Sequence, residues 1–262
     1  MPRRADRCAV SSGAFRKESN TLDGYLPIPR DSESFESLSR ILSAERFNTF
    51  VHAASDNAEE ALRLYAWNIE ISSAFWGSFH VLEISLRNSL HFQLTKLAEQ
   101  EDWWNAQLSL PRNSKRDLLH DDTKNEIQKP ISTATKKQDA KGSQTEPGHV
   151  VAELSFGFWN GMLANRYQER LWNGCLTHAF PHYTGRRGDI HFDLDRLRML
   201  RNRIAHHEPI FDRDLAIDHD KICGLIGYIE PKARVRVTKN SRIPEILGMK
   251  EKRLNGQLKS SF

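Results

Sequence analysis

A short segment in the C-terminal half of the chain concentrates side chains that can do chemistry. Arg201, Asn202, His206, His207 and Glu208 supply a guanidinium, an amide, two imidazoles and a carboxylate. An arginine can stabilise a phosphate whose charge grows in a transition state, and a histidine can transfer protons near neutral pH. This segment is therefore the first candidate for a catalytic site.

The spacing of the residues around this segment predicts that a helix carries it. Arg201 and Glu208 continue an apolar stripe, and Pro209 is expected to end the helix because it lacks an amide donor. On a straight helix Arg201 and Glu208 lie about 20° apart, Asn202 and His206 about 40°, but Arg201 and His206 about 140°. We therefore expect two faces, with an Arg201–Glu208 ion pair on the buried one. A role for Glu208 in positioning a histidine is the alternative. The apolar members of the stripe are Ile190, Leu194, Leu197 and Ile204.

A second polar group lies on the strongest helical pattern of the chain, which runs from Asn57 to about Leu97. Glu83, Arg87 and His91 follow one another at intervals of four residues, and Asn88 lies beside them. An exposed ion pair at this spacing contributes about 0.3–0.5 kcal/mol. Because the neighbouring positions are apolar, we interpret Glu83, Arg87 and Asn88 as a supporting group that orients the helix of Arg201.

The pattern along the chain predicts an all-α protein, since no alternating strand pattern of useful length occurs. Residues 1–30 are expected to be disordered or loosely attached, and 31–230 to form one helical domain with a polar loop at about 130–148. Gly77 is a candidate kink or break in the long helix. A last helix is expected to begin with Asp212 as its N-cap and to end before Pro231. Residues 231–262 remain as a basic tail.

The charge of the chain is unevenly distributed. Residues 231–262 carry a net charge of +7, whereas the whole protein of 262 residues carries +4. Such a segment suits a polyanionic partner such as RNA, although a solvated, solubilising terminus explains it equally well.

Several classes of protein are disfavoured by composition. No apolar run approaches the length of about 20 residues that a membrane span needs, and the N-terminus lacks the apolar core of a signal peptide. Cys8, Cys175 and Cys223 have no paired spacing, which argues against disulfides and favours a reducing cytoplasm. Adjacent residues on a helix point about 100° apart, so His206, His207 and Glu208 do not make a good metal site. We expect no metal, no other cofactor and no membrane partner.

The segment that contains Arg201 and the two histidines resembles a known family. Arg201-Asn202-Arg203-Ile204-Ala205-His206 is similar to the arginine-polar-x3-histidine motif of the HEPN superfamily of helical ribonucleases. The wider string from Leu197 to Phe211 resembles the Abi-like (abortive infection) proteins of bacteria. Three further segments look similar in the same order along the chain, namely Leu64-Tyr65-Ala66-Trp67-Asn68, Leu82-Glu83-Ile84-Ser85-Leu86-Arg87-Asn88 and Ala152-Glu153-Leu154-Ser155-Phe156-Gly157-Phe158-Trp159.

The resemblance implies a HEPN-like helical bundle with additional helices and a metal-independent endoribonuclease that acts in phage defence or as a toxin. In such an enzyme a ribose 2′-hydroxyl attacks the adjacent phosphate. Arg201 would stabilise the phosphate, His206 would act as base or acid, and Asn202 would orient substrate or imidazole. His207 fits the looser spacing of the same motif, so the catalytic histidine is open, with His206 favoured. A non-catalytic RNA-binding or regulatory protein is the alternative.

The resemblance also implies partners. RNA is the expected substrate or ligand, and a homodimer is expected because the family commonly builds its site from two protomers. A two-fold axis would also bring an arginine and a histidine together despite their 140° separation on one helix. An antitoxin or a noncoding RNA is the further partner that the resemblance suggests.

Overall fold

The computed structural model describes residues 40–111, 114 and 117–260. All regular elements in these ranges are helical, and no strand occurs among them, which confirms the all-α class. The N-terminal segment expected at 1–30 lies outside the described residues. None of the helices in the described part of the chain combines the length and the apolar character that a membrane crossing requires.

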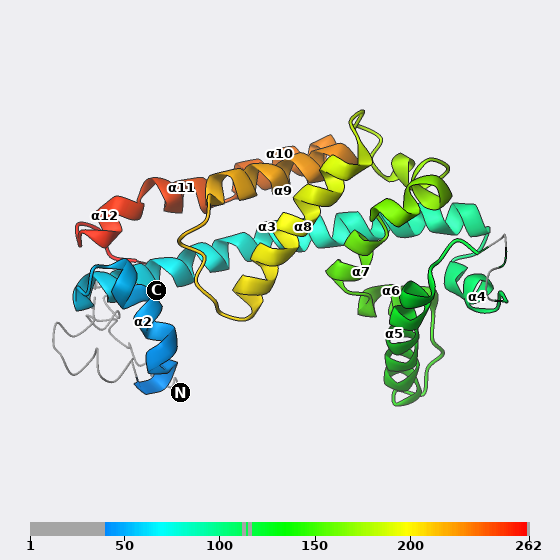
Figure 1. Ribbon diagram of the computed structural model, residues 1–262, viewed down its shortest axis with the longest axis horizontal. Coiled ribbons are helices and arrows are strands. Elements are labelled where there is room, and N and C mark those ends of the chain that lie inside the picture. Colours follow the sequence, from blue (N-terminus) through cyan, green and yellow to red (C-terminus); the bar gives the residue numbers. More distant parts are fainter. Residues whose placement is uncertain (1–39, 112–113, 115–116, 261–262) are drawn as a thin grey trace, which may run out of the picture.

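Helix α3 (Ala58–Ala98) is the axis of the molecule (Figure 1). It begins where the Asn57 side chain accepts a hydrogen bond from the backbone N–H of Glu60 at 3.1 Å, as an N-cap does. The observed bounds confirm the predicted helix, but the expected break at Gly77 is wrong because α3 continues through it. A glycine inside a helix costs only about 1 kcal/mol. The burial of neighbouring side chains such as Phe75 and Phe79 outweighs that cost.

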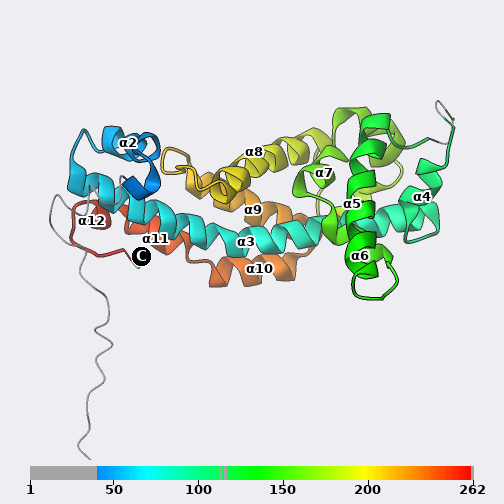
Figure 2. The ribbon, with the colours of Figure 1, turned by 90° about the horizontal axis from the view of Figure 1, so that it is seen from below.

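Three further helices set the environment of the candidate residues. α8 (Arg187–Ala205) carries Arg201, α9 (Leu215–Ile229) packs along α3, and α10 (Pro231–Asn240) packs on α9. In Figure 2, α8 and α10 lie on opposite sides of α3. The expected N-cap Asp212 is wrong, because Asp214 accepts the hydrogen bond from the backbone N–H of Ile217 at 3.0 Å.

The expected basic tail is helical for most of its length. After α10, α11 (Ile243–Gly248) and α12 (Lys250–Leu254) pack against the first half of α3. The indole N–H of Trp67 donates to the carbonyl of Ile246 at 3.2 Å, and the buried Arg253 forms an ion pair with Glu70. Residues 231–254 therefore belong to the helical body, because α10 packs on α9, whereas α11 and α12 pack on α3.

The remaining helices pack around the two ends of α3. They are α2 (Ala44–Ala53), α4 (Trp103–Leu108), α5 (Asp121–Asp139), α6 (Pro147–Glu153), α7 (Phe156–Gly161) and the short helices η1 (Asn165–Tyr167), η2 (Gln168–Trp172) and η3 (Leu176–Ala179). In Figure 1, α5 projects away from the axis. The polar loop expected at 130–148 is wrong for 130–139, which continue α5, and the connection spans only 140–146. The sequence did not predict this helix, because α5 is mostly polar and buries few side chains, Ile127 and Ala134 among them.

Candidate functional site

A cavity of about 510 Å³ lies where α3, α8 and the segment 152–159 meet. It is lined by four of the residues singled out from the sequence, namely Arg201, Asn202, Glu83 and Arg87. The first two come from α8 and the last two from α3. Two residues of the supporting group, Glu83 and Arg87, therefore line the same cavity as the arginine of the motif. We call this cavity the arginine pocket.

The guanidinium of Arg201 is held from two sides. Its Nε donates a hydrogen bond to Oε1 of Glu83 at 2.9 Å, and its Cζ lies 5.6 Å from the ring centroid of Trp76. The terminal nitrogens make no hydrogen bond to a described residue, so they can donate to a ligand. The predicted Arg201–Glu208 ion pair is wrong, because Glu83 of α3 takes that place.

Two donors at the arginine pocket are buried and unsatisfied. Nε of Arg87 and Nε1 of Trp159 have no hydrogen-bond partner in the described structure, and both residues line the pocket. A buried donor without an acceptor costs about 1–3 kcal/mol. A ligand that offers acceptor oxygens, such as a phosphate, would satisfy such donors.

Sequence reasoning did not place three of the lining residues in the site, although two of them, Ser155 and Trp159, belong to a segment that carries the family resemblance. Arg198, Ser155 and Trp159 line the pocket beside Arg201. The signal for Arg198 was present, because it lies one helical turn before Arg201 and Asn202 on the same face. For Ser155 and Trp159 no spacing signal exists, since α7 meets α8 only through the tertiary fold. Among these arginines, Arg198 is partly neutralised by Asp195, to which its terminal nitrogen donates at 2.8 Å.

Five aromatic side chains of the described chain that could in principle stack on nucleic-acid bases are part of the core. Trp103, Trp104, Phe156, Phe158 and Trp159 are all buried. Their burial assigns them to core packing. Trp76 is the aromatic residue near Arg201 that is exposed, with 41% of its surface accessible.

The histidines of the motif lie at the end of α8 rather than within it. α8 ends at Ala205, His206 is the C-cap, and His207 adopts a left-handed conformation with φ 57°. The backbone N–H of His207 donates to the carbonyl of Ile204 at 3.1 Å, and that of Glu208 to the carbonyl of Arg203 at 2.8 Å. This pair of bonds is the Schellman motif, in which glycine usually takes the left-handed position. The predicted continuation to Glu208 is therefore wrong.

This helix end separates the histidines from the arginine pocket. His206 and His207 are exposed, and neither lines the pocket. His207 and Glu208 instead border a second cavity of about 660 Å³ against α2. Glu208 lies 3.7 Å from Nε of Arg203, not from Arg201. Within one chain the described residues that line the arginine pocket include no imidazole.

Asn88 of the supporting group and the neighbouring His91 do not reach the pocket. Asn88 is exposed on α3 and does not line it. His91 accepts a hydrogen bond at Nδ1 from the indole N–H of Trp103 at 3.1 Å. Burial lowers the pKa of His91, and the carboxylate of Glu101 partly opposes this shift. The role of His91 is therefore to pack α4 against α3.

The chain segment after α8 is fixed to α3. The side-chain carbonyl of Asn68, which is buried, accepts a hydrogen bond from the backbone N–H of Ile210 at 2.8 Å. The four segments that carry the family resemblance thus converge, since three line the arginine pocket and the fourth fixes the chain after His207. In the described part of the chain, no group of three or more His, Cys, Asp or Glu residues is arranged to hold a metal ion.

Comparison with known proteins identifies the family of this chain. The family model described as Abi-like protein matches residues 24–212. The chain belongs to the Abi-like protein family. Comparisons with curated proteins and with solved structures gave no significant match.

Proposed function

We propose that this protein is a metal-independent endoribonuclease of the HEPN type that acts in bacterial abortive infection or as a toxin. Membership of the Abi-like family is consistent with a role in abortive infection. The observation that carries the proposal is the arginine pocket, where Arg201, Arg198 and Arg87 accompany two unsatisfied donors. Guanidinium groups that converge on a cavity stabilise a phosphate through charge-assisted hydrogen bonds.

In the proposed reaction the 2′-hydroxyl of a ribose attacks the adjacent phosphorus, and the 5′-oxygen of the next nucleotide leaves. Arg201, oriented by Glu83, stabilises the negative charge on the phosphate oxygens. A histidine accepts the 2′-hydroxyl proton and a histidine returns a proton to the leaving oxygen. His206 is the favoured group and His207 the alternative. Asn202 orients the substrate.

The proposed active unit is a homodimer. Arg201 lies in a pocket lined by no imidazole among the described residues, and His206 is exposed at the end of the same helix. A two-fold axis can place the His206 of one protomer at the arginine pocket of the other. The geometry of one chain supports this arrangement because it separates the two groups that the reaction must combine.

The alternative function is RNA binding without cleavage. The same separation favours it, since a pocket of arginines without a proton-transfer group binds phosphate and does not cut. In that case the Abi-like protein would hold a structured or noncoding RNA and act as a regulator.

The test is cleavage of RNA by the purified protein, with and without a chelator, followed by analysis of the product ends. The proposal predicts cleavage that resists chelation and leaves a 2′,3′-cyclic phosphate and a 5′-hydroxyl. Loss of cutting in chelator contradicts the metal-independent mechanism. Bound but intact RNA favours the alternative.

Expression in a bacterial host tests the toxin role. Growth arrest by the wild type that both Arg201→Ala and His206→Ala relieve supports the ribonuclease. Arrest that neither substitution relieves, with intact cellular RNA, contradicts it.

A further inference from the structure

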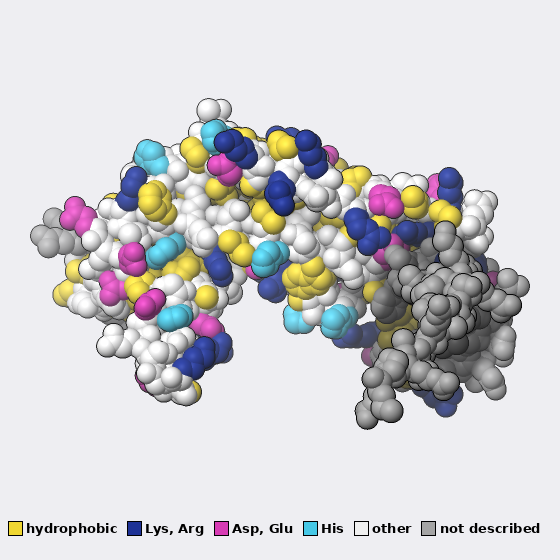
Figure 3. Space-filling view, turned by 180° about the vertical axis from the view of Figure 1, so that it is seen from behind, with side chains coloured by type: hydrophobic (Ala, Val, Ile, Leu, Met, Phe, Trp, Pro, Cys, Tyr) yellow, Lys and Arg dark blue, Asp and Glu magenta, His cyan; other side chains and the backbone are white. Residues whose placement is uncertain are grey.

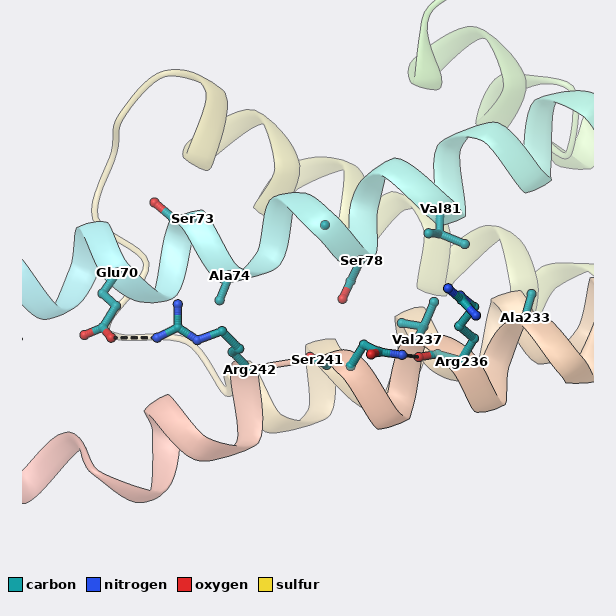
Figure 4. Close-up of a pocket in the computed structure, with 12 residues that line it drawn as sticks. Glu70, Ser73, Ala74, Ser78, Val81, Ala233, Arg236, Val237, Ser241 and Arg242 are labelled. Carbon is teal, nitrogen blue, oxygen red and sulfur yellow. Dashed lines mark hydrogen bonds and ion pairs between the residues drawn. The ribbon is translucent and has the colours of Figure 1, made fainter. Parts of the chain in front are cut away.

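A groove of about 680 Å³ runs between α3 and the α10–α11 segment (Figure 4). It lies on the side of α3 that carries α10, whereas the arginine pocket lies on the side that carries α8 (Figure 2). The volume is within the range of about 300–1,000 Å³ that is typical of ligand sites. The groove and the arginine pocket share no lining residue, so they are separate cavities.

The floor of the groove is kept open by Gly77. An added Cβ at this position would meet no atom within 4 Å, so packing within the protein does not require a glycine here. Glycine in the interior of a helix costs about 0.5–1 kcal/mol relative to alanine. What the glycine provides is space in the groove, which Gly77 lines.

Next to Gly77 the hydroxyl of Ser78 points toward the groove (Figure 4). Ser78 is only 4% exposed. Its hydroxyl oxygen is not one of the buried side-chain atoms that lack a partner among the described residues. The groove thus presents a hydroxyl that a ligand can contact.

The helix that forms the other wall, α10, carries positive charge in the groove and along its edge. Arg236 lines the groove, whereas Lys232 and Lys239 lie on α10 four residues before it and three residues after it, beside the groove and outside its lining. None of the three forms an ion pair with a described residue. Figure 3 shows Lys and Arg side chains gathered over this part of the molecule. Arg236 extends from α10 toward α3 (Figure 4). These cations repel one another unless a polyanion neutralises them.

At the far end of the groove, Arg242 shares its ion-pair partner, Glu70, with Arg253. It lies 3.5 Å from Oε1 of Glu70, and Glu70 also forms the buried ion pair with Arg253. One carboxylate thus faces two guanidinium groups. The groove has a cation at each end and aliphatic side chains of α3 and α10 between them.

We propose that this groove binds the backbone of single-stranded RNA and anchors it away from the arginine pocket. This inference rests on RNA being the ligand of the proposed function. The phosphates contact the stripe of Lys232, Arg236 and Lys239, and the sugar and base edges occupy the aliphatic floor beside Gly77. A single strand exposes those apolar surfaces, whereas a duplex hides its bases inside the helix.

The charge of the groove is tested with fluorescence anisotropy of a labelled single-stranded RNA and the full chain in an Arg201→Ala background, which prevents cleavage. The double substitution Arg236→Gln with Lys239→Gln is expected to weaken binding about tenfold at moderate salt and to reduce the slope of log K against log salt by about 1.4. Lys129→Gln with Lys136→Gln is the matched control on α5, where both lysines are exposed. Binding should change less than about twofold in this control. Equal loss in both double variants, or no loss in either, overturns the proposal.

The shape of the groove is tested without a change of charge. Gly77→Leu fills the floor, and the helix should gain stability because glycine is a poor helix former. Single-stranded RNA binding is expected to weaken at least about fivefold, with an unchanged or higher melting temperature. Gly148→Leu, at an exposed position of α6 that is equally open, is the control. Normal binding by Gly77→Leu, or equal affinity for a duplex of the same length, contradicts the assignment.

The outcomes separate this proposal from the ribonuclease. Cleavage by the wild type together with normal binding by the groove variants overturns the groove and leaves the ribonuclease standing. Binding that depends on the groove, without any cleavage by the wild type, supports the groove and overturns the ribonuclease. A wild type that binds no RNA contradicts both.

Discussion

The two ends of the segment 201–208 lie in different environments. At one end, Arg201 is held by Glu83 and Trp76 inside a pocket with two unsatisfied donors. At the other end, His206 and His207 are exposed on a helix terminus. One motif in the sequence thus lies in two places in the fold, with Arg201 in a pocket lined by further arginines and the two histidines exposed outside that pocket.

The largest effect should come from Arg201. We expect Arg201→Ala to reduce RNA cleavage about 10²–10³-fold, because it removes a charged donor from the phosphate in the transition state. Arg203→Ala is the matched control, since both arginine side chains are 32% exposed on α8 and Arg203 pairs with Glu208 and Asp212 outside the pocket. The measurement is initial cleavage rate with equal folding by circular dichroism. An equal loss of RNA cleavage in both variants would contradict a special role of the arginine pocket.

Arg87 tests the pocket as a binding site. We expect Arg87→Met to weaken RNA binding about tenfold, because a charged hydrogen bond to the ligand is lost. Thermal stability should stay constant or rise, because the substitution removes a buried donor that has no partner in the protein. Lys96→Met, an exposed site on the same helix, provides the control. Unchanged RNA affinity in Arg87→Met would show that the unsatisfied donors do not face a ligand.

His207 tests the other end of the segment. We expect His207→Gly to stabilise the fold by about 1 kcal/mol, because glycine adopts the left-handed conformation without the strain of a side chain. Calorimetry measures the gain. If His206 transfers the proton, cleavage should stay within about twofold of the wild type, whereas a loss like that of Arg201→Ala would transfer the catalytic role to His207.

The smallest effect concerns His91, a half-buried histidine that lines neither the arginine pocket nor the end of α8. Burial lowers the pKa of His91, so the unfolded chain binds a proton more readily and stability falls as the pH drops below about 6.5. His91→Gln keeps an acceptor for the indole of Trp103 and removes this contribution. The difference in melting temperature between about pH 7.5 and about pH 5.5 should become smaller. An unchanged difference would show that His91 is not one of the groups responsible.

The sequence predicted the elements that depend on local pattern. The bounds of α3 followed from its apolar spacing, and the structure adds that Asn57 caps its N-terminus. The end of α8 could not be predicted in this way, because the Schellman motif uses His207 where a glycine is usual. α5 was missed for the opposite reason, since its polar residues do not show the apolar period on which the prediction relied.

The candidate site was predictable only in part. Arg201, Asn202, Glu83 and Arg87 were singled out and do meet in one pocket. The contact between Arg201 and Glu83 was not predictable, because the two residues lie more than a hundred positions apart on different helices. A periodic pattern within one helix carries no information about such a contact. The position of Trp159 in the pocket was not predictable either, because it depends on a tertiary contact.

The most direct test of the shared site is to mix two inactive variants. In a mixed dimer of Arg201→Ala and His206→Ala, one of the two composite sites has both Arg201 and His206 intact. The account predicts that each variant alone is inactive and that an equal mixture recovers about a quarter of wild-type RNA cleavage once subunits have exchanged. A mixture that stays inactive, although mixed dimers form and the wild type cleaves RNA, would contradict the shared site.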